Sequence, residues 1–122
     1  MTRGAILIVD DNATNLFVLR AMLSKLGYEA IEAKDGQSGV DLALALQPRL
    51  VLMDLRMPQM DGMAAAAHIR SVLGDEAPAI VAVTASVTRE QRDVCTAAGF
   101  AALLAKPIKF EELVDIVARF TA

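Results

Sequence analysis

Residues 50–54, Leu-Val-Leu-Met-Asp, are a continuous apolar run that ends in a carboxylate. Three more apolar runs end in polar side chains: 6–9 before Asp10 and Asp11, 80–83 before Thr84, and 101–105 before Lys106 and Pro107. Short runs that are apolar on both faces are typical of strands in a parallel sheet that helices cover on both sides. Residues 29–33 predict a fifth, weaker strand.

Between these runs the apolar residues recur at helical spacing. Helices are predicted after Asn12 or Thr14 with an end near Gly27, before Pro48, over 63–73, over 88–98 and over 110–120. Five alternations of strand and helix predict an α/β fold, a doubly wound five-stranded parallel sheet with five helices. Because residues 1–122 contain no linker, repeat or low-complexity segment, we expect a single domain.

The composition disfavours several classes of protein. No apolar stretch approaches the roughly 18 residues of a membrane span, and no apolar signal region follows Met1. A net charge of -3 without a Lys/Arg block argues against direct binding of nucleic acid. The only cysteine, Cys95, cannot form an internal disulfide. We therefore expect a soluble, cytoplasmic domain that does not insert into membranes.

Because parallel strands end at one edge of a sheet, Asp10, Asp11, Asp54, Thr84 and Lys106 are expected to gather there. Clustered carboxylates repel one another unless a cation compensates, and carboxylate oxygens suit Mg²⁺. One carboxylate could then attack phosphorus and form an aspartyl phosphate. The ammonium group of Lys106 would balance the charge on the phosphoryl oxygens, and the hydroxyl of Thr84 would donate a hydrogen bond to one of them.

Each of these groups has a plainer interpretation when it is taken alone. The acidic pair Asp10 and Asp11 could cap a helix. Asp54 could be a turn residue, Thr84 a hydroxyl at a strand end, and Lys106 a solvated charge. Their joint occurrence at successive strand ends favours the phosphoryl site. Elsewhere, His68 is expected to be a surface or packing residue rather than a phosphohistidine, and Cys95 a small buried hydrophobe.

Four motifs together resemble the receiver domains of response regulators in two-component signalling. They are Val9-Asp10-Asp11-Asn12, residues 53–58 with Asp61-Gly62, Val83-Thr84-Ala85, and Lys106-Pro107. The resemblance runs along essentially the whole chain. It is closer to the receivers of hybrid histidine kinases than to the simplest stand-alone receivers. It implies the flavodoxin-like receiver fold.

The resemblance also implies a role for each site residue. Asp54 is then the phosphoacceptor, and Asp11, Asp54 and the backbone carbonyl of Arg56 hold Mg²⁺ directly, whereas Asp10 acts largely through water. Lys106 pairs with the phosphoryl group, and its peptide bond to Pro107 is cis. Thr84 moves toward the phosphoryl oxygen and draws the following loop with it.

The implied partners are a histidine kinase or a histidine phosphotransfer protein, and the implied state is a monomer or weak dimer. Such a domain is not an enzyme in the usual sense, because it catalyses only its own phosphotransfer and dephosphorylation. One residue departs from the family: Leu103 stands where receivers usually carry a Tyr or Phe that turns inward with the threonine.

Two alternatives accompany this interpretation. An aspartyl-phosphate phosphohydrolase needs a second carboxylate two residues after the nucleophile, where this chain has Arg56. The other alternative is a receiver-like interaction module that keeps the fold and is not phosphorylated.

Overall fold

The computed structural model describes residues 4–121, and their five strands form one parallel sheet. The strands are β1 Ala5–Val9, β2 Glu29–Ala33, β3 Leu50–Asp54, β4 Ala79–Thr84 and β5 Ala102–Ala105. Their spatial order is β2-β1-β3-β4-β5. All five predicted strands are present. Asp54 and Thr84 were predicted to follow their strands, but they are the last residues of β3 and β4.

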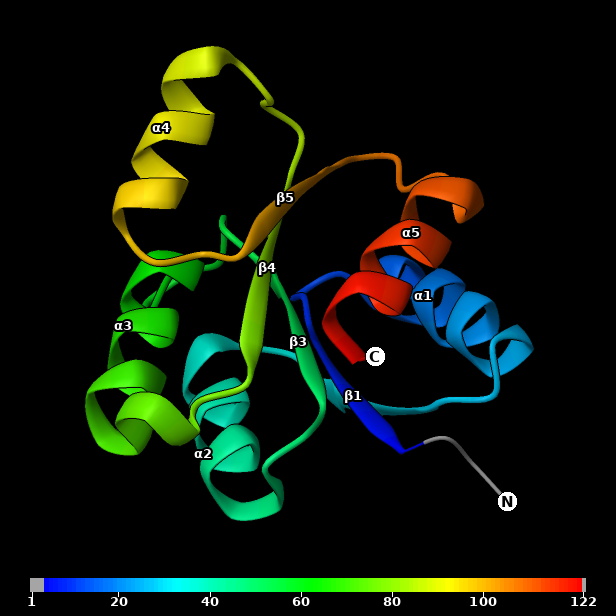
Figure 1. Cartoon of the computed structure of the whole chain (residues 1–122), viewed down its shortest axis with the longest axis horizontal. Helices are drawn as coiled ribbons and strands as arrows, with labels where there is room; N and C mark the ends of the chain where they lie inside the picture. Colours follow the sequence, from blue (N-terminus) through cyan, green and yellow to red (C-terminus); the bar gives the residue numbers. More distant parts are fainter. Residues whose placement is uncertain (1–3, 122) are drawn as a thin grey trace.

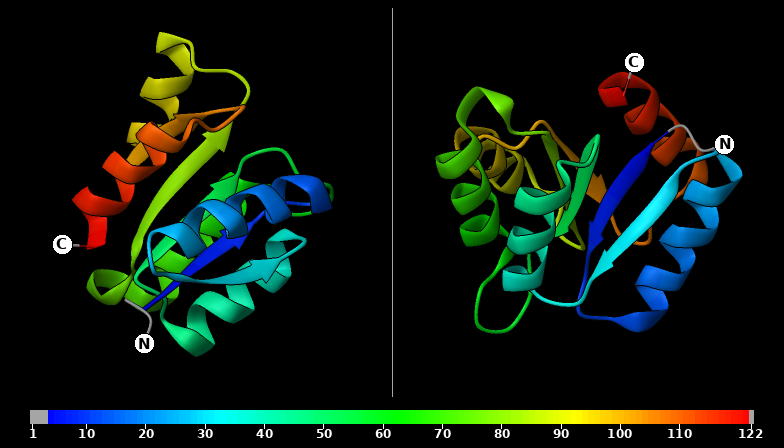
Figure 2. Two further views of the ribbon diagram at one scale, coloured as in Figure 1. Left: turned by 90° about the vertical axis from the view of Figure 1, so that its right-hand side faces the viewer. Right: turned by 90° about the horizontal axis from the view of Figure 1, so that it is seen from below.

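Five α-helices follow the five strands in turn. They are α1 Ala13–Lys25, α2 Gly36–Leu46, α3 Gly62–Leu73, α4 Arg89–Ala97 and α5 Phe110–Thr121, with a short 3-10 helix, η1 Gly74–Glu76, after α3. Helices α1 and α5 cover one face of the sheet, and α2, α3 and α4 cover the other (Figures 1 and 2). The predicted doubly wound α/β fold is therefore confirmed.

The apolar strands supply a core on each face of the sheet. Because successive side chains of a strand point to opposite faces, Ile6 and Ile8 pack with α1 and α5, whereas Leu7 and Val9 pack with α2 and α3. Every residue of β3 is buried. This two-sided burial explains why the central runs of the sequence are apolar throughout rather than alternating.

Side-chain caps fix where the helices begin. Asn12, Asp35, Asp61 and Thr88 each accept a hydrogen bond from the backbone N–H three residues later. Gly27 and Gly99 follow the ends of α1 and α4 with φ of 85° and 93°, as expected for helix-ending glycines. Within residues 4–121, no helix is both long and apolar enough to cross a membrane.

The strand order places the functional edge of the molecule. Strand β1 lies between β2 and β3, so the chain leaves the ends of β1 and β3 in opposite directions across the sheet. Ligands of open α/β sheets bind at the carboxyl ends of strands where the order reverses in this way. In this chain, Asp10, Asp11 and Asp54 lie at that point.

Candidate phosphoryl and metal site

One pocket at the carboxyl edge of the sheet brings together every predicted site residue. The pocket encloses about 230 Å³, and its lining includes Asp10, Asp11, Asp54, Arg56, Thr84 and Lys106. These residues come from the ends of β1, β3, β4 and β5 and from the loop after β3. The sequence prediction that these groups gather at one edge is thus correct.

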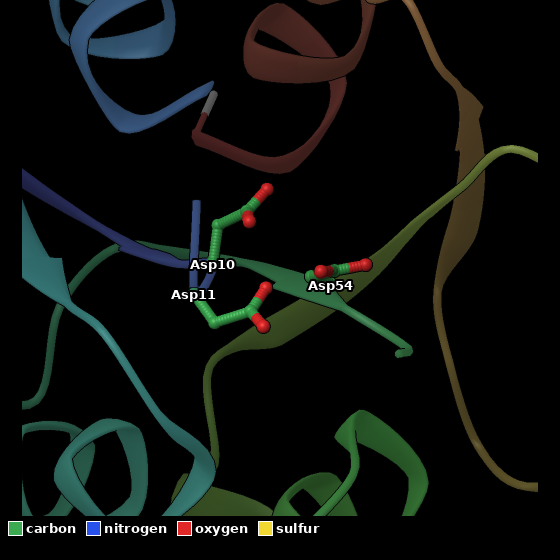
Figure 3. A group of neighbouring side chains, drawn as sticks. All are labelled: Asp10, Asp11 and Asp54. Atoms are coloured by element: carbon green, nitrogen blue, oxygen red, sulfur yellow. The ribbon is translucent and has the colours of Figure 1, made fainter. Parts of the chain in front are cut away.

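Three carboxylates form the acidic part of the pocket (Figure 3). Asp10, Asp11 and Asp54 each offer one oxygen, and these oxygens lie within 4.8 Å of one another. Asp10 is 2% exposed and Asp54 5% exposed, whereas Asp11 faces solvent. Hard oxygen ligands this close together, on the rim and in the interior of an open pocket, fit a divalent cation such as Mg²⁺.

Lys106 bridges the two buried carboxylates. Its Nζ lies 3.2 Å from Asp10 Oδ2 and 3.3 Å from Asp54 Oδ1. The backbone N–H of Lys106 donates to the carbonyl of Thr84 at 2.9 Å, which ties the lysine to the end of β4. Its peptide bond to Pro107 is cis, as the family resemblance implied.

Burial and charge act against each other on Asp54 and Lys106. Burial is the main cause of a raised pKa for the Asp54 carboxyl, the charge of Asp10 raises that pKa further, and Lys106 only partly offsets the two. Burial alone would lower the pKa of Lys106, but the charges of Asp10 and Asp54 raise it above its usual value. Lys106 is therefore firmly protonated, whereas an ionised Asp54 is disfavoured until further positive charge arrives.

Thr84, at the end of β4, and Arg56, in the loop after β3, line the pocket together with Asp54. Thr84 is 4% exposed, and its hydroxyl oxygen accepts a hydrogen bond from the backbone N–H of Ser86 at 3.2 Å. The backbone N–H of Arg56 donates to Asp54 Oδ1 at 3.3 Å, while the Arg56 side chain is exposed. The Arg56 contact joins the loop after β3 directly to Asp54, whereas the Thr84 contact lies within the turn after β4.

The start of α3 packs against the backbone of Asp54 and Leu55. A Cβ atom on Gly62 would lie 2.2 Å from the carbonyl oxygen of Asp54 and 2.9 Å from the Cα of Leu55. The backbone N–H of Gly62 donates to the carbonyl of Leu55 at 3.1 Å. Only glycine permits this approach, which explains the Asp61-Gly62 pair that the sequence analysis noted without a structural reason.

Sequence analysis missed one residue of the site, Asn15. Its side-chain Nδ2 donates to Asp10 Oδ2 at 3.1 Å, and Asn15 also lines the acidic pocket. Position 15 lies three residues after the cap Asn12, where a polar side chain normally serves the helix end. This helix-capping spacing was the available signal, but it does not by itself indicate contact with Asp10.

Three further expectations concern residues outside the pocket. Leu103, at the position where the resemblance led us to expect an aromatic residue, lies partly buried in β5 on the face that α2, α3 and α4 cover, and α4 is the helix that contacts β5 there. His68 is exposed on α3 and does not line the pocket. Cys95 is buried in α4, as predicted.

The comparisons with known proteins agree with this geometry. The family model of the response regulator receiver domain matches residues 6–118. The hybrid signal transduction histidine kinase F of Dictyostelium discoideum is 35% identical over 123 residues, which cover 98% of this chain and 11% of that protein. The chain spans between 10% and 12% of the length of the first three histidine kinases it matches. The expected likeness to hybrid kinases is confirmed.

Two solved structures are similar along their length. The receiver domain of the sensor histidine kinase PA1611 from Pseudomonas aeruginosa, crystallised with magnesium in its active-site cleft, is 37% identical with a TM-score of 0.88; the match covers 97% of each chain. The receiver domain of Saccharomyces cerevisiae Ssk1, solved with the histidine phosphotransfer protein Ypd1, is 28% identical with a TM-score of 0.90. That match covers 96% of this chain and 88% of the yeast chain.

Proposed function

Because the chain belongs to the family of response regulator receiver domains, we propose that it accepts a phosphoryl group on Asp54 in two-component or phosphorelay signalling. One observation carries the proposal: a buried carboxylate, Asp54, lies in one pocket with two other carboxylates and the ammonium group of Lys106. The pocket thus combines a nucleophile with groups that balance the charge of a transferred phosphoryl group.

The residues around Asp54 fit the roles that this reaction requires. Asp10, Asp11, Asp54 and the backbone carbonyl of Arg56 would hold Mg²⁺, which when bound relieves the repulsion among the carboxylates and balances charge on the phosphoryl oxygens. An Asp54 oxygen attacks phosphorus while the bond from phosphorus to the donor imidazole nitrogen breaks, and that nitrogen keeps the electron pair. Lys106 then turns from the carboxylates to pair with the phosphoryl group.

Thr84 links the chemistry to a conformational change. In the structure described above, its hydroxyl oxygen accepts the Ser86 N–H. In the phosphorylated state the hydroxyl donates to a phosphoryl oxygen instead, which draws Thr84 and the loop before α4 toward Asp54. Since α4 buries only one side chain, that of Cys95, a small movement of this loop suffices to shift the helix.

We propose that the phosphoryl donor is a phosphohistidine on a histidine kinase or a histidine phosphotransfer protein. The likeness to a receiver solved with such a transfer protein supports this assignment. An apolar groove of about 350 Å³ also opens beside the pocket, lined by Val18, Leu19 and Ile108 together with Asp10 and Lys106. Because the groove and the pocket share Asp10 and Lys106, a protein that docks in the groove would bring its phosphohistidine close to Asp54.

The proposed reaction ends with hydrolysis of the aspartyl phosphate, and no small-molecule product is turned over beyond phosphate. Arg56 stands where an aspartyl-phosphate phosphohydrolase would need its acid/base carboxylate. A steady-state assay of phosphate release from phosphate monoesters, which are poorer phosphoryl donors than acetyl phosphate or phosphohistidine, is therefore expected to give no multiple-turnover rate above a protein-free blank.

Intact-mass measurement after incubation with acetyl phosphate tests the proposal. We expect a gain of one phosphoryl group that requires Mg²⁺ and that Asp54→Asn abolishes. Asp61→Asn is the matched control, because Asp61 caps α3 and asparagine caps a helix equally well. If wild-type protein remains unmodified with Mg²⁺ present, the alternative of an unphosphorylated interaction module replaces this proposal.

A further inference from the structure

Asp10 is a buried carboxylate with three donors around it. Its Oδ1 accepts the backbone N–H of Asn12 at 2.9 Å, and its Oδ2 accepts Asn15 Nδ2 at 3.1 Å and lies 3.2 Å from Lys106 Nζ. The Asp10 side chain is 3% exposed. Such a carboxylate is costly to bury unless donors satisfy it, so each of the three contacts contributes to keeping it in place.

Two groups at the beginning of α1, the backbone N–H of Asn12 and the side chain of Asn15, contact this carboxylate and do not complete a capping box. In a capping box, the side chain three residues after the cap accepts the backbone N–H of the capping residue. Here Asp10 accepts that N–H, of Asn12, and Asn15 turns its side-chain amide to Asp10 instead. The backbone N–H of Asn15 still donates to Asn12 Oδ1 at 3.0 Å. The helix is thus capped normally, and the Asn15 side chain is left for the site.

Lys106 and Asn15 both contact Oδ2 of Asp10. In the proposed reaction Lys106 leaves this oxygen, whereas the Asn15 side chain has no second partner among the described residues of the pocket to turn to. Lys106 also contacts Asp54 and has to pair with the phosphoryl group that Asp54 receives. Once the lysine turns away, the amide of Asn15 is the side-chain donor that still holds Asp10 Oδ2. Asn15 extends from the first turn of α1, a rigid element, and carries no charge that would compete with a cation.

We propose that Asn15 is a positioning residue, which keeps Asp10 oriented toward the acidic pocket while Lys106 moves between the carboxylates and the phosphoryl group. This inference rests on the proposed function and assigns a role to a side chain outside the predicted site. Residues that orient a metal-binding carboxylate typically change metal affinity or activity by about 10–100-fold when they are replaced. Asn15 therefore sets both the Mg²⁺ affinity and the rate at which Asp54 is phosphorylated.

Two substitutions remove the amide, and one keeps it. Asn15→Leu preserves the approximate shape of the side chain, and Asn15→Ala removes it with a residue that favours helix. Asn15→Gln retains the donor on a longer stem. Gln37→Leu is the matched control, because Gln37 Nε2 donates to Asp41 Oδ1 at 2.9 Å on α2, where the same kind of amide-to-carboxylate bond lies outside the pocket.

The readouts are the Mg²⁺ dissociation constant from amide NMR titration, the rate of phosphorylation by acetyl phosphate, and the midpoint of thermal unfolding. We expect the Leu and Ala variants to bind Mg²⁺ about tenfold more weakly and to phosphorylate about tenfold more slowly. The Gln variant should lie closer to wild type than to either of them. The control should keep wild-type affinity and rate, whatever its change in unfolding midpoint.

If Asn15→Leu does not fold, the Ala variant decides the question. Wild-type Mg²⁺ affinity in a folded Leu or Ala variant would overturn the inference and leave Asn15 as a neighbour of a helix cap. If wild-type protein itself gains no phosphoryl group, the proposed function fails, and the Mg²⁺ affinities alone still show whether Asn15 positions Asp10.

Discussion

The carboxyl group of Asp54 is placed where its ionised form is unfavourable without a cation. Burial and the charge of Asp10 raise its pKa above the usual 3.8. A carboxyl whose folded-state pKa is raised binds more protons in the folded than in the unfolded state, so folding stability falls as the pH rises from the usual pKa to the raised one. The loss is complete once the pH exceeds the raised pKa. The site thus retains an unfavourable charge that Mg²⁺ can relieve.

Asp54→Asn is therefore expected to stabilise the protein at neutral pH in the absence of Mg²⁺. The variant should unfold a few degrees above wild type, and the difference should shrink as the pH falls toward the usual pKa of an aspartate. Thermal unfolding at several pH values in the presence of a chelator measures this. Equal stability of the two proteins at neutral pH would show that the surroundings of Asp54 do not make its negative charge unfavourable.

Asp35→Asn should show the opposite sign. The backbone N–H of Ser38 lowers the pKa of Asp35 at the cap of α2. The stability that this carboxylate contributes is present above its usual pKa and is lost as the pH falls through the lowered value. The variant should consequently be slightly less stable than wild type at neutral pH and approach it in acid, and a parallel thermal scan reports the difference.

The sequence predicted the identity of the pocket residues better than their contacts. Asp10, Asp54, Thr84 and Lys106 follow from their places at strand ends, because parallel strands share an edge. The sharing of Asp10 Oδ2 between Lys106 and Asn15 depends on side-chain directions and on the register of β1 against β3. Neither is encoded in an apolar pattern, so this contact emerges only from the fold.

At the level of helices, the close approach of α3 to β3 predicts an effect of a single methyl group. Gly62→Ala would place Cβ 2.2 Å from the Asp54 carbonyl oxygen, and backbone atoms cannot rotate away as a side chain can. We expect a loss of about 1–3 kcal/mol in the free energy of unfolding, measured by urea denaturation. Phosphorylation should also slow, because α3 and the acceptor strand have to separate.

Ser71→Ala is the control for that change, since Ser71 is exposed on the same helix. Its unfolding free energy should stay within about 0.5 kcal/mol of wild type. A Gly62→Ala protein as stable as this control would mean that the start of α3 can move without cost, and the fixed geometry around Asp54 would then need another cause.

A second helix-level feature is the attachment of α4. Arg70 of α3 donates from Nη1 to the carbonyl of Gly99 at 3.3 Å and from Nη2 to that of Ala98, and its guanidinium lies 5.6 Å from the ring centre of Phe100. Only Cys95 of α4 is buried. Arg70 therefore ties the end of α4 to α3, where few apolar contacts hold the helix.

Arg70→Met should loosen α4 selectively, because methionine keeps an apolar stem and loses the donors. Hydrogen bonds from charged groups contribute about 1.5–3 kcal/mol, and half-exposure reduces this, so amide exchange in α4 should rise about tenfold. Hydrogen-exchange mass spectrometry measures the change. The control Arg20→Met removes an exposed ion pair with Glu32 on the other face and should leave amide exchange in α4 unaltered. If both variants change the exchange of α4 equally, Arg70 does not specifically attach α4 to α3.

For the molecule as a whole, the alternation of strands and helices predicted the fold class but not the strand order. The apolar runs indicate that the strands are buried, but they do not indicate that β1 lies between β2 and β3. The family resemblance implied the flavodoxin-like fold, and the helices on the two faces of the sheet build one core on each side. The strand order in turn makes one edge of the sheet the reactive edge.

At position 103 this chain has leucine, where the family resemblance led us to expect an aromatic residue. Leu103 lies in β5 and packs against the core on the face that α2, α3 and α4 cover, where α4 contacts β5. In the proposed switch no aromatic ring at position 103 carries the movement of Thr84, and we expect the loop through Ser86, which leads directly into α4, to carry it instead. With Mg²⁺ and beryllofluoride, amide NMR shifts should extend from Thr84 through residues 85–97. Shifts confined to the pocket would show that this path does not transmit the change.

The most direct test is to identify which residue carries the phosphoryl group. Protein treated with acetyl phosphate and Mg²⁺ is reduced with borohydride, which converts an aspartyl phosphate to homoserine, and its peptides are then sequenced by mass spectrometry. We predict homoserine at position 54 alone, and none when Mg²⁺ is omitted. Homoserine at Asp10 or Asp11, a phosphoryl group on His68, or no modification at all would refute the assignment of Asp54 as the phosphoacceptor.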